Sequence, residues 1–229
     1  MRIEDLNWMD VENYLETDDR LILSIGATEQ HGFLSLTSDN RLIEAVADAA
    51  SKKTGVLVAP SLNFGSSPYF LDYPGTFSLR MSTLMDAIED LVRSAHKHGF
   101  RRILILNGHG GNEGARARLS ELINDLQDLN LAWYSWFTSH SVQAICENYD
   151  IKPTHGSWLE AFPFNIVSDL PNGTKKPPYI AGLLNSKKAK EAYGDGNFGG
   201  KYKVNDEIMQ ELFEAILQDV ITLLDFTGF

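Results

Sequence analysis

Four short apolar runs divide the chain, and each is closed by glycine, proline, asparagine or other polar residues. Runs of this length that are bounded by turn-forming residues are typical of buried strands rather than of helices. We therefore predict strands at Leu21–Ala27, Val56–Pro60, Ile103–Leu106 and Leu131–Phe137.

Segments with helical spacing lie between these runs and after the last of them. Their apolar side chains recur every three or four residues, so each set shares one helix face. The four faces comprise Leu42, Val46 and Ala50; Leu84, Ile88, Leu91, Val92 and Ala95; Leu119, Leu122, Ile123, Leu126 and Leu129; and Ile208, Leu212, Ile216, Val220 and Leu223. This alternation predicts an α/β fold with a mostly parallel sheet covered by helices on both faces.

Composition and charge limit the classes of protein to which this chain can belong. The chain has 229 residues, of which 43% are hydrophobic, and we expect one domain over residues 1–229. Its formal net charge of −11 would repel nucleic-acid phosphates, so nucleic acid is excluded as a general partner. Cys146 is the only cysteine, which excludes a disulfide framework within the chain and suits a reducing compartment.

The beginning of the chain is acidic and contains no uninterrupted apolar run, which is unlike a signal peptide. No stretch of the sequence reaches the ~18 consecutive apolar residues that a membrane-spanning helix needs. We therefore expect a soluble, cytoplasmic protein with no membrane partner.

Candidate chemistry begins where the first predicted strand ends, which is where open α/β sheets bind ligands. Glu29 and His31 are two residues apart, so both point to the same side of an extended chain. A carboxylate and an imidazole suit Zn²⁺ or a similar divalent ion, and a hydrogen-bonded pair without metal is the alternative. Asp39 precedes the first predicted helix, where it is either a further candidate or a helix N-cap.

The third predicted strand leads into the glycine-rich segment Asn107-Gly-His-Gly-Gly-Asn112. A phosphate-binding loop is one interpretation, because helix N-termini attract anions. However, no Gly-Lys-Ser/Thr ending follows, and the glycines miss the G-x-G-x-x-G spacing by one residue. A histidine between glycines at a strand end favours a ligand or catalytic role for His109.

The remaining candidates lie later in the chain. His155 and Glu160 are five residues apart, and the alternative for them is a helix start with Glu160 on a solvated face. Two irregular segments follow, Pro171–Pro178 and Gly194–Gly200. The second either helps to form a pocket or a subunit contact, or is simply a flexible loop.

Taken together, these segments resemble the creatininase (creatinine amidohydrolase) family. The resemblance rests on motifs that fall in family order over residues 24–160: Gly26-Ala-Thr-Glu-Gln-His-Gly32 with Asp39, Tyr73-Pro-Gly-Thr-Phe-Ser-Leu-Arg80, Asn107-Gly-His-Gly-Gly-Asn112, and His155 with Glu160. It implies a three-layer αβα sandwich with a site for two divalent ions per chain. Zn²⁺ is the first choice, with Mn²⁺ or Fe²⁺ as alternatives.

The same resemblance implies roles for the site residues. Glu29, His31, Asp39 and His109 would be metal ligands, and Asp39 would bridge the two ions. His155 would transfer a proton, and Glu160 would be a ligand or base near the second ion.

Departures from the family pattern bear on the substrate. Creatininase has a glutamate at the position of Gly111, so Glu160 becomes the nearest match for the fifth ligand. The loop between His31 and Asp39 is one residue shorter than usual, and the segment after His155 reads Gly-Ser-Trp-Leu-Glu-Ala-Phe. The pocket has therefore changed, and the substrate need not be creatinine.

The resemblance implies a metal-dependent amidohydrolase that attacks a small cyclic amide or related carbonyl substrate with activated water. A hydrolase of a cyclic keto-sugar, of the inosose type, is the alternative, as is a non-catalytic metal- or phosphate-binding α/β protein. The family also implies a homo-oligomer, commonly a hexamer. The aromatic run from Trp133 to Phe137 could contribute to such an interface or belong to the core.

Overall fold

The computed structural model describes residues 1–227, and within them four parallel strands form one sheet in the order β2-β1-β3-β4. The strands are β1 (Arg20–Ile25), β2 (Leu57–Val58), β3 (Arg102–Asn107) and β4 (Asn130–Ser135). A separate antiparallel pair joins β5 (Thr174–Lys175) to β6 (Gly200–Lys201). The parallel sheet predicted from the apolar runs is confirmed.

Both faces of the sheet are apolar, which explains why its strands appear as continuous apolar runs rather than alternating ones. Successive side chains of a strand point to opposite faces. Thus Ile22 and Leu104 belong to one hydrophobic core, and Leu23 and Ile105 belong to the other.

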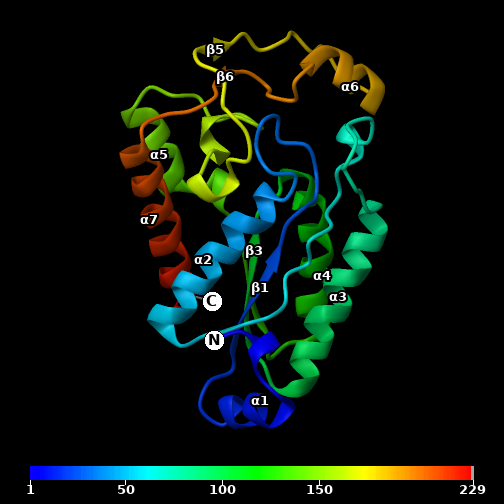
Figure 1. Ribbon diagram of the computed structural model, residues 1–229. Helices are drawn as coiled ribbons and strands as arrows, with labels where there is room; N and C mark the ends of the chain where they lie inside the picture. Colours follow the sequence, from blue (N-terminus) through cyan, green and yellow to red (C-terminus); the bar gives the residue numbers. More distant parts are fainter. Residues whose placement is uncertain (228–229) are drawn as a thin grey trace.

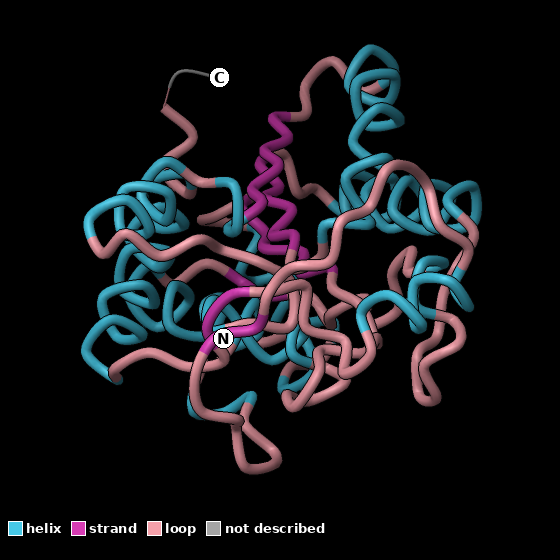
Figure 2. Tube along the Cα trace, turned by 90° about the horizontal axis from the view of Figure 1, so that it is seen from above, coloured by secondary structure: helices cyan, strands magenta, loops and turns pink. Residues whose placement is uncertain are grey.

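Helices cover both faces, so the molecule has three layers (Figures 1 and 2). The helices are α1 (Trp8–Leu15), α2 (Ser38–Thr54), α3 (Met81–His98), α4 (Arg116–Asp125), α5 (His140–Asn148), α6 (Ser186–Tyr193) and α7 (Asp206–Leu223). Side chains of α2, α5 and α7 complete the first core, and side chains of α3 and α4, with part of α1, complete the second. The predicted α/β sandwich is confirmed.

Several boundaries differ from the sequence prediction. The second strand is only two residues long, and Pro60 offers no backbone N–H to extend it. The helix predicted through Leu129 ends at Asp125, although Leu129 still packs in the core. Helices α1, α5 and α6 were not predicted, because segments of eight or nine residues carry too few apolar repeats to be recognised.

The aromatic run at the end of β4 belongs mainly to the core. Tyr134 and Trp136 are buried, and Trp136 lies in a short 3-10 helix, Trp136–Thr138, that ends the predicted fourth strand early. Within residues 1–227 no helix combines the length and apolar character needed to cross a membrane.

The strand register gathers the chemistry at one end of the sheet. Ile25, Asn107 and Ser135 are aligned across β1, β3 and β4, so the loops that follow these strands leave at the same level. Figure 1 shows β5, β6 and α6 at the end of the molecule opposite α1. This end contains the candidate site.

Candidate metal centre

The loop after β1 holds Glu29 and His31 in a fixed, buried position. The Asn40 side chain of α2 donates to the carbonyl of Ala27 at 2.8 Å, and the Glu29 amide donates to the carbonyl of Leu36 at 2.9 Å. Glu29 and His31 are each only 1% exposed. The two side chains predicted to share a side of the chain therefore meet inside the protein.

The loop after β3 is organised by the two asparagines of its motif. Asn107 accepts a hydrogen bond from the His109 amide at 3.1 Å. The Asn112 side chain donates to the carbonyl of Gly26 and accepts from the amide of Ser66, both at 3.1 Å. Asn112 thereby ties together the loops that follow three different strands, with His109 between them.

Asp39 is the second residue of α2, and its carboxylate faces the loops instead of capping the helix. Its Oδ1 lies 2.9 Å from His31 Nε2, and its Oδ2 lies 3.1 Å from His109 Nδ1. The N-cap interpretation is wrong, because Thr37 holds that position. Each oxygen of Asp39 thus faces a different histidine.

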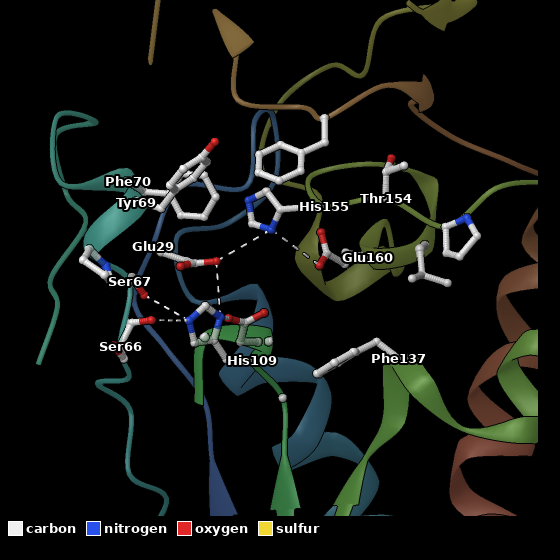
Figure 3. A pocket seen from close by; sticks show the side chains of 18 of the residues that line it. Glu29, Ser66, Ser67, Tyr69, Phe70, His109, Phe137, Thr154, His155 and Glu160 are labelled. Carbon is white, nitrogen blue, oxygen red and sulfur yellow. Dashed lines mark hydrogen bonds and ion pairs between the residues drawn. The ribbon is translucent and has the colours of Figure 1, made fainter. Parts of the chain in front are cut away.

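His155 and Glu160 approach the same centre from the later part of the chain. Glu160 ends the 3-10 helix Trp158–Glu160, and its Oε2 accepts a hydrogen bond from the Gly156 amide at 2.6 Å. Its Oε1 therefore points inward, 3.8 Å from His31 Nε2 and 3.9 Å from His155 Nδ1. The solvated-face alternative for Glu160 is wrong, and Figure 3 shows Glu29, His109, His155 and Glu160 directed toward one another.

Backbone carbonyls fix the two most buried histidine rings from outside. His31 Nδ1 lies 3.1 Å from the carbonyl oxygen of Glu29, and His109 Nε2 lies 3.0 Å from that of Ser66. A carbonyl oxygen only accepts, so the outer ring nitrogen carries the proton in each case. The inner nitrogens, His31 Nε2 and His109 Nδ1, are then available as ligands, which is the usual arrangement around protein-bound metals.

Unpartnered carboxylate oxygens test whether this donor set fits a metal. Both oxygens of Glu29 and Oδ2 of Asp39 are buried without a hydrogen-bond donor. Buried carboxylates without compensation are costly, so these atoms favour a positive charge beside them, which a bound metal ion or a protonated histidine supplies. Oxygen and nitrogen donors from Glu29, Asp39 and His109 lie within 4.8 Å of one another, as do those from His31, Asp39 and Glu160. The donor set therefore fits divalent metal.

The charges of the site move the pKa values of its histidines. Burial would lower the pKa of His109, but the carboxylates of Glu29 and Asp39 raise it to about 9. Burial likewise opposes the rise at His31, whose pKa the Asp39 and Glu160 carboxylates hold well above its usual range. Burial raises the pKa of Glu160 to about 7. Without metal, protons on these groups balance the carboxylate charge.

An aromatic pocket of about 740 Å³ opens above the cluster (Figure 3). Phe70 stacks on the His155 ring at 4.7 Å between centroids, and Phe198 lies 5.0 Å from the same ring. Among the described residues, no lysine or arginine lines this pocket. Sequence reasoning missed both aromatic residues, and the only signal was that Phe198 belongs to the irregular segment Gly194–Gly200.

Two further positions bear on the fifth ligand. A side chain at Gly111 would collide with the carbonyl of Ser66 and with the His109 ring, so no carboxylate fits there. Glu113 is bonded by Ser135 and Asn107 instead of facing the cluster. Of the two remaining candidate carboxylates, Glu160 and Glu113, Glu160 is the one directed toward the cluster.

Comparison with known proteins agrees with these observations. The family model described as creatinine amidohydrolase matches residues 4–224. Creatinine amidohydrolase of Pseudomonas putida is 31% identical over 156 residues, which cover 61% of this chain and 60% of that protein. A 3-dehydro-scyllo-inosose hydrolase of Thermotoga maritima is 28% identical over a region that covers 58% of this chain and 43% of that protein. A mycofactocin precursor peptide peptidase of Mycolicibacterium smegmatis is 36% identical over a region that covers 45% of this chain and 44% of that protein. The chain thus aligns with 60% or less of the length of these relatives.

Solved structures extend the likeness over nearly the whole chain. A crystal structure of creatinine amidohydrolase superposes with a TM-score of 0.81 at 22% identity, covering 97% of this chain and 96% of the other. A creatininase described with Mn gives a TM-score of 0.78 at 24% identity, with the same coverage. At this identity the likeness shows a shared fold. Because the family model spans residues 4–224, this chain belongs to the creatininase family.

Proposed function

We propose that this protein is a metal-dependent hydrolase that holds two divalent ions and cleaves an amide C–N bond. The observation that carries the proposal is the placement of Asp39, whose two oxygens face His31 and His109 separately. A carboxylate placed in this way is suited to bridge two ions. The P. putida relative, a creatinine amidohydrolase, supports the amide assignment.

The proposed ligands divide into two sets that share Asp39. Glu29, Asp39 and His109 would hold one ion, and His31, Asp39 and Glu160 would hold the other. Carboxylate and imidazole donors suit Zn²⁺ first, with Mn²⁺ or Fe²⁺ as alternatives. Solved creatininases described with Mn and as Zn-Zn type support this range. Bound in pairs, such ions supply an activated water nucleophile and polarise the substrate carbonyl.

His155 is the proposed proton-transfer residue. Its Nδ1 lies 3.7 Å from Glu29 Oε1 and 3.9 Å from Glu160 Oε1, so it faces the reaction centre. Burial, together with the neighbouring His31 charge, holds the pKa of His155 well below its usual range. A ring that is neutral at pH 7 accepts a proton at Nδ1 and returns it to the departing nitrogen.

The pocket walls favour an amide over a keto-sugar. A polyhydroxylated ring needs many hydrogen-bonding partners, whereas Phe70, Met81, Phe137 and Phe198 present apolar surface. A volume of about 740 Å³ also leaves room for a substituent on a small cyclic amide. Binding of a phosphate ligand is disfavoured, since carboxylates line the described pocket and no lysine or arginine does.

A substrate screen of the metal-loaded protein tests this proposal. Lactams and other cyclic amides, formamides, short peptides and keto-inositols would be compared at equal concentration. We expect hydrolysis of amides, lost on chelation and restored by Zn²⁺ or Mn²⁺. If the protein turns over keto-inositols alone, the substrate is a keto-sugar and the amide assignment is wrong. If the protein holds no metal and its activity does not change on chelation, the proposal of a metal-dependent hydrolase is contradicted.

Replacing Glu160 tests its role as the fifth ligand. Glu160→Gln keeps the size of the side chain but removes its charge, so the ion beside His31 loses one of three proposed ligands. We expect elemental analysis to find close to one ion per chain in place of two. A variant with two ions and full activity would show that Glu160 is not a ligand.

Metal uptake should release protons. With pKa values raised to about 9 for His109 and well above the usual range for His31, both rings are protonated near pH 7 in the metal-free protein. Ligand imidazoles must be neutral, so binding expels these protons and metal affinity increases as pH rises toward 9. Titration calorimetry in buffers of different ionisation enthalpy should give between two and three protons per chain at pH 7, two from the rings and part of one from Glu160, whose pKa is raised to about 7. Binding without proton release would contradict this assignment.

We also propose a homo-oligomer, supported by an exposed apolar segment. Tyr179 and Leu183, between β5 and α6, are 92% and 102% exposed. Large apolar side chains that are almost fully exposed would gain free energy if another protein surface covered them. Light scattering at micromolar concentration should find a closed assembly, which we expect to be a hexamer. The double variant Tyr179→Ser/Leu183→Ser should weaken it, and Lys176→Ser should not. A strict monomer would refute the assembly.

A further inference from the structure

Gln30 contacts the outer nitrogen of His155 with two groups of opposite character. His155 Nε2 lies 2.8 Å from the backbone carbonyl oxygen of Gln30 and 2.9 Å from the side-chain Nε2 of the same residue. Gln30 is 5% exposed, although it lies between two proposed ligands in the sequence. One residue thus presents both an acceptor and a donor to a single ring nitrogen.

Neighbouring backbone groups fix the orientation of the Gln30 amide. Its Oε1 accepts a hydrogen bond from the Gly32 amide at 3.0 Å, and its Nε2 donates to the carbonyl of Gly196 at 3.1 Å. Reversal of the amide would set two donors together at Gly32 and two acceptors together at Gly196. The NH₂ group therefore faces His155. Gly196 must be glycine, because a Cβ there would collide with Oε1 of Gln30.

This pair of contacts accommodates either tautomer of His155. When Nε2 carries the proton, it donates to the Gln30 carbonyl. When Nδ1 carries the proton, the bare Nε2 accepts from the Gln30 amide. Each tautomer gains one hydrogen bond and faces one opposed contact, so the two should have comparable energies. A partner that offered only an acceptor would hold the Nε2–H tautomer alone.

The ring is also restrained on its faces. Phe70 stacks on it at an interplanar angle of 15°, and the His31 ring lies 4.5 Å away between centroids. Rotation of the ring would break these contacts and both contacts to Gln30. A histidine gains and loses a proton during turnover. Its ring keeps one orientation only if each protonation state has a hydrogen-bond partner in that orientation.

We propose that Gln30 is a positioning residue that keeps His155 Nδ1 directed at the reaction centre whichever ring nitrogen carries the proton. The inference rests on the proposed function, in which Nδ1 takes a proton from the attacking water and passes it to the departing nitrogen. While Nδ1 holds that proton, the Nε2–H bond to the Gln30 carbonyl retains the ring. After the transfer the neutral ring occupies the same place.

The test is nitrogen NMR of ¹⁵N-histidine-labelled protein loaded with Zn²⁺, with the His155 signals identified by their loss in His155→Ala. In the unaltered chain we expect shifts of Nδ1 and Nε2 that lie between protonated and unprotonated values, because both tautomers are populated. Gln30→Met keeps the length of the side chain without its donor. It should collapse the population to Nε2–H at unchanged metal content. Because that tautomer leaves Nδ1 free to accept a proton, kcat should not decrease.

Gln127→Met, at an exposed position, is the control and should leave both readouts unchanged. Identical tautomer populations in the unaltered chain and in Gln30→Met would overturn the inference. A chain that takes up no Zn²⁺ would instead contradict the proposed function. The tautomer comparison in the metal-free protein would still decide the role of Gln30.

Discussion

Asp39→Ala should empty the metal site almost completely. In the proposed arrangement Asp39 is the one ligand shared by both ions, so its loss removes a donor from each. Replacing residues that merely orient ligands costs about 10–100-fold in affinity, and loss of a bridging ligand should cost more. The metal content measured by elemental analysis should therefore decrease from close to two ions per chain to nearly none. Amide hydrolysis should be lost with the metal.

Two companion variants make this result specific. Asp39→Asn keeps the size of the side chain and should also lose metal, because an amide is a much weaker ligand than a carboxylate. Glu113→Gln alters a carboxylate that Ser135 and Asn107 bind away from the cluster, and it should retain both ions. Full metal occupancy in Asp39→Ala, with unchanged thermal unfolding, would show that Asp39 does not bridge.

The part of the site that sequence could predict is the part that lies at strand ends. Glu29, His31 and His109 follow buried apolar runs directly, and parallel strands deliver such residues to the same edge of a sheet. The same apolar runs predicted the layers of the fold, because a strand buried on both faces leaves a clear signal. These are local features of the chain.

Other parts of the site depend on contacts that no local pattern records. Gln30 acquires its role through Gly196, which is 166 residues away in the sequence. Phe70, at the end of the 3-10 helix Pro68–Phe70, and Phe198, in a loop, meet at the His155 ring from segments with no periodicity. Glu160 faces inward only because the Gly156 amide binds its outer oxygen. Gln30, Phe70 and Phe198 become identifiable once the tertiary structure brings the loops together, whereas Glu160 was a candidate from its spacing to His155 and from the family resemblance.

His155→Ala should separate proton transfer from metal binding. Neither of the two proposed three-ligand sets includes His155, so the variant should retain both ions. Turnover should nevertheless decrease by roughly 10²–10⁴-fold, the range typical for loss of a general acid–base residue. Measurement of kcat alongside the metal content distinguishes this variant from Asp39→Ala, in which both decrease.

Imidazole added to the His155→Ala protein provides a sharper test of the chemical role. Truncation leaves a space beside Phe70 and Phe198 where the ring was, and free imidazole of the same shape can occupy it. Part of the lost activity should return with increasing imidazole if His155 acts by proton transfer. His140→Ala, at an exposed position on α5, should show neither the loss nor the rescue. If His155→Ala binds its full metal content and turns over substrate as fast as the unaltered protein, another group transfers the proton. Glu160, whose pKa is raised to about 7, would be the next residue to test.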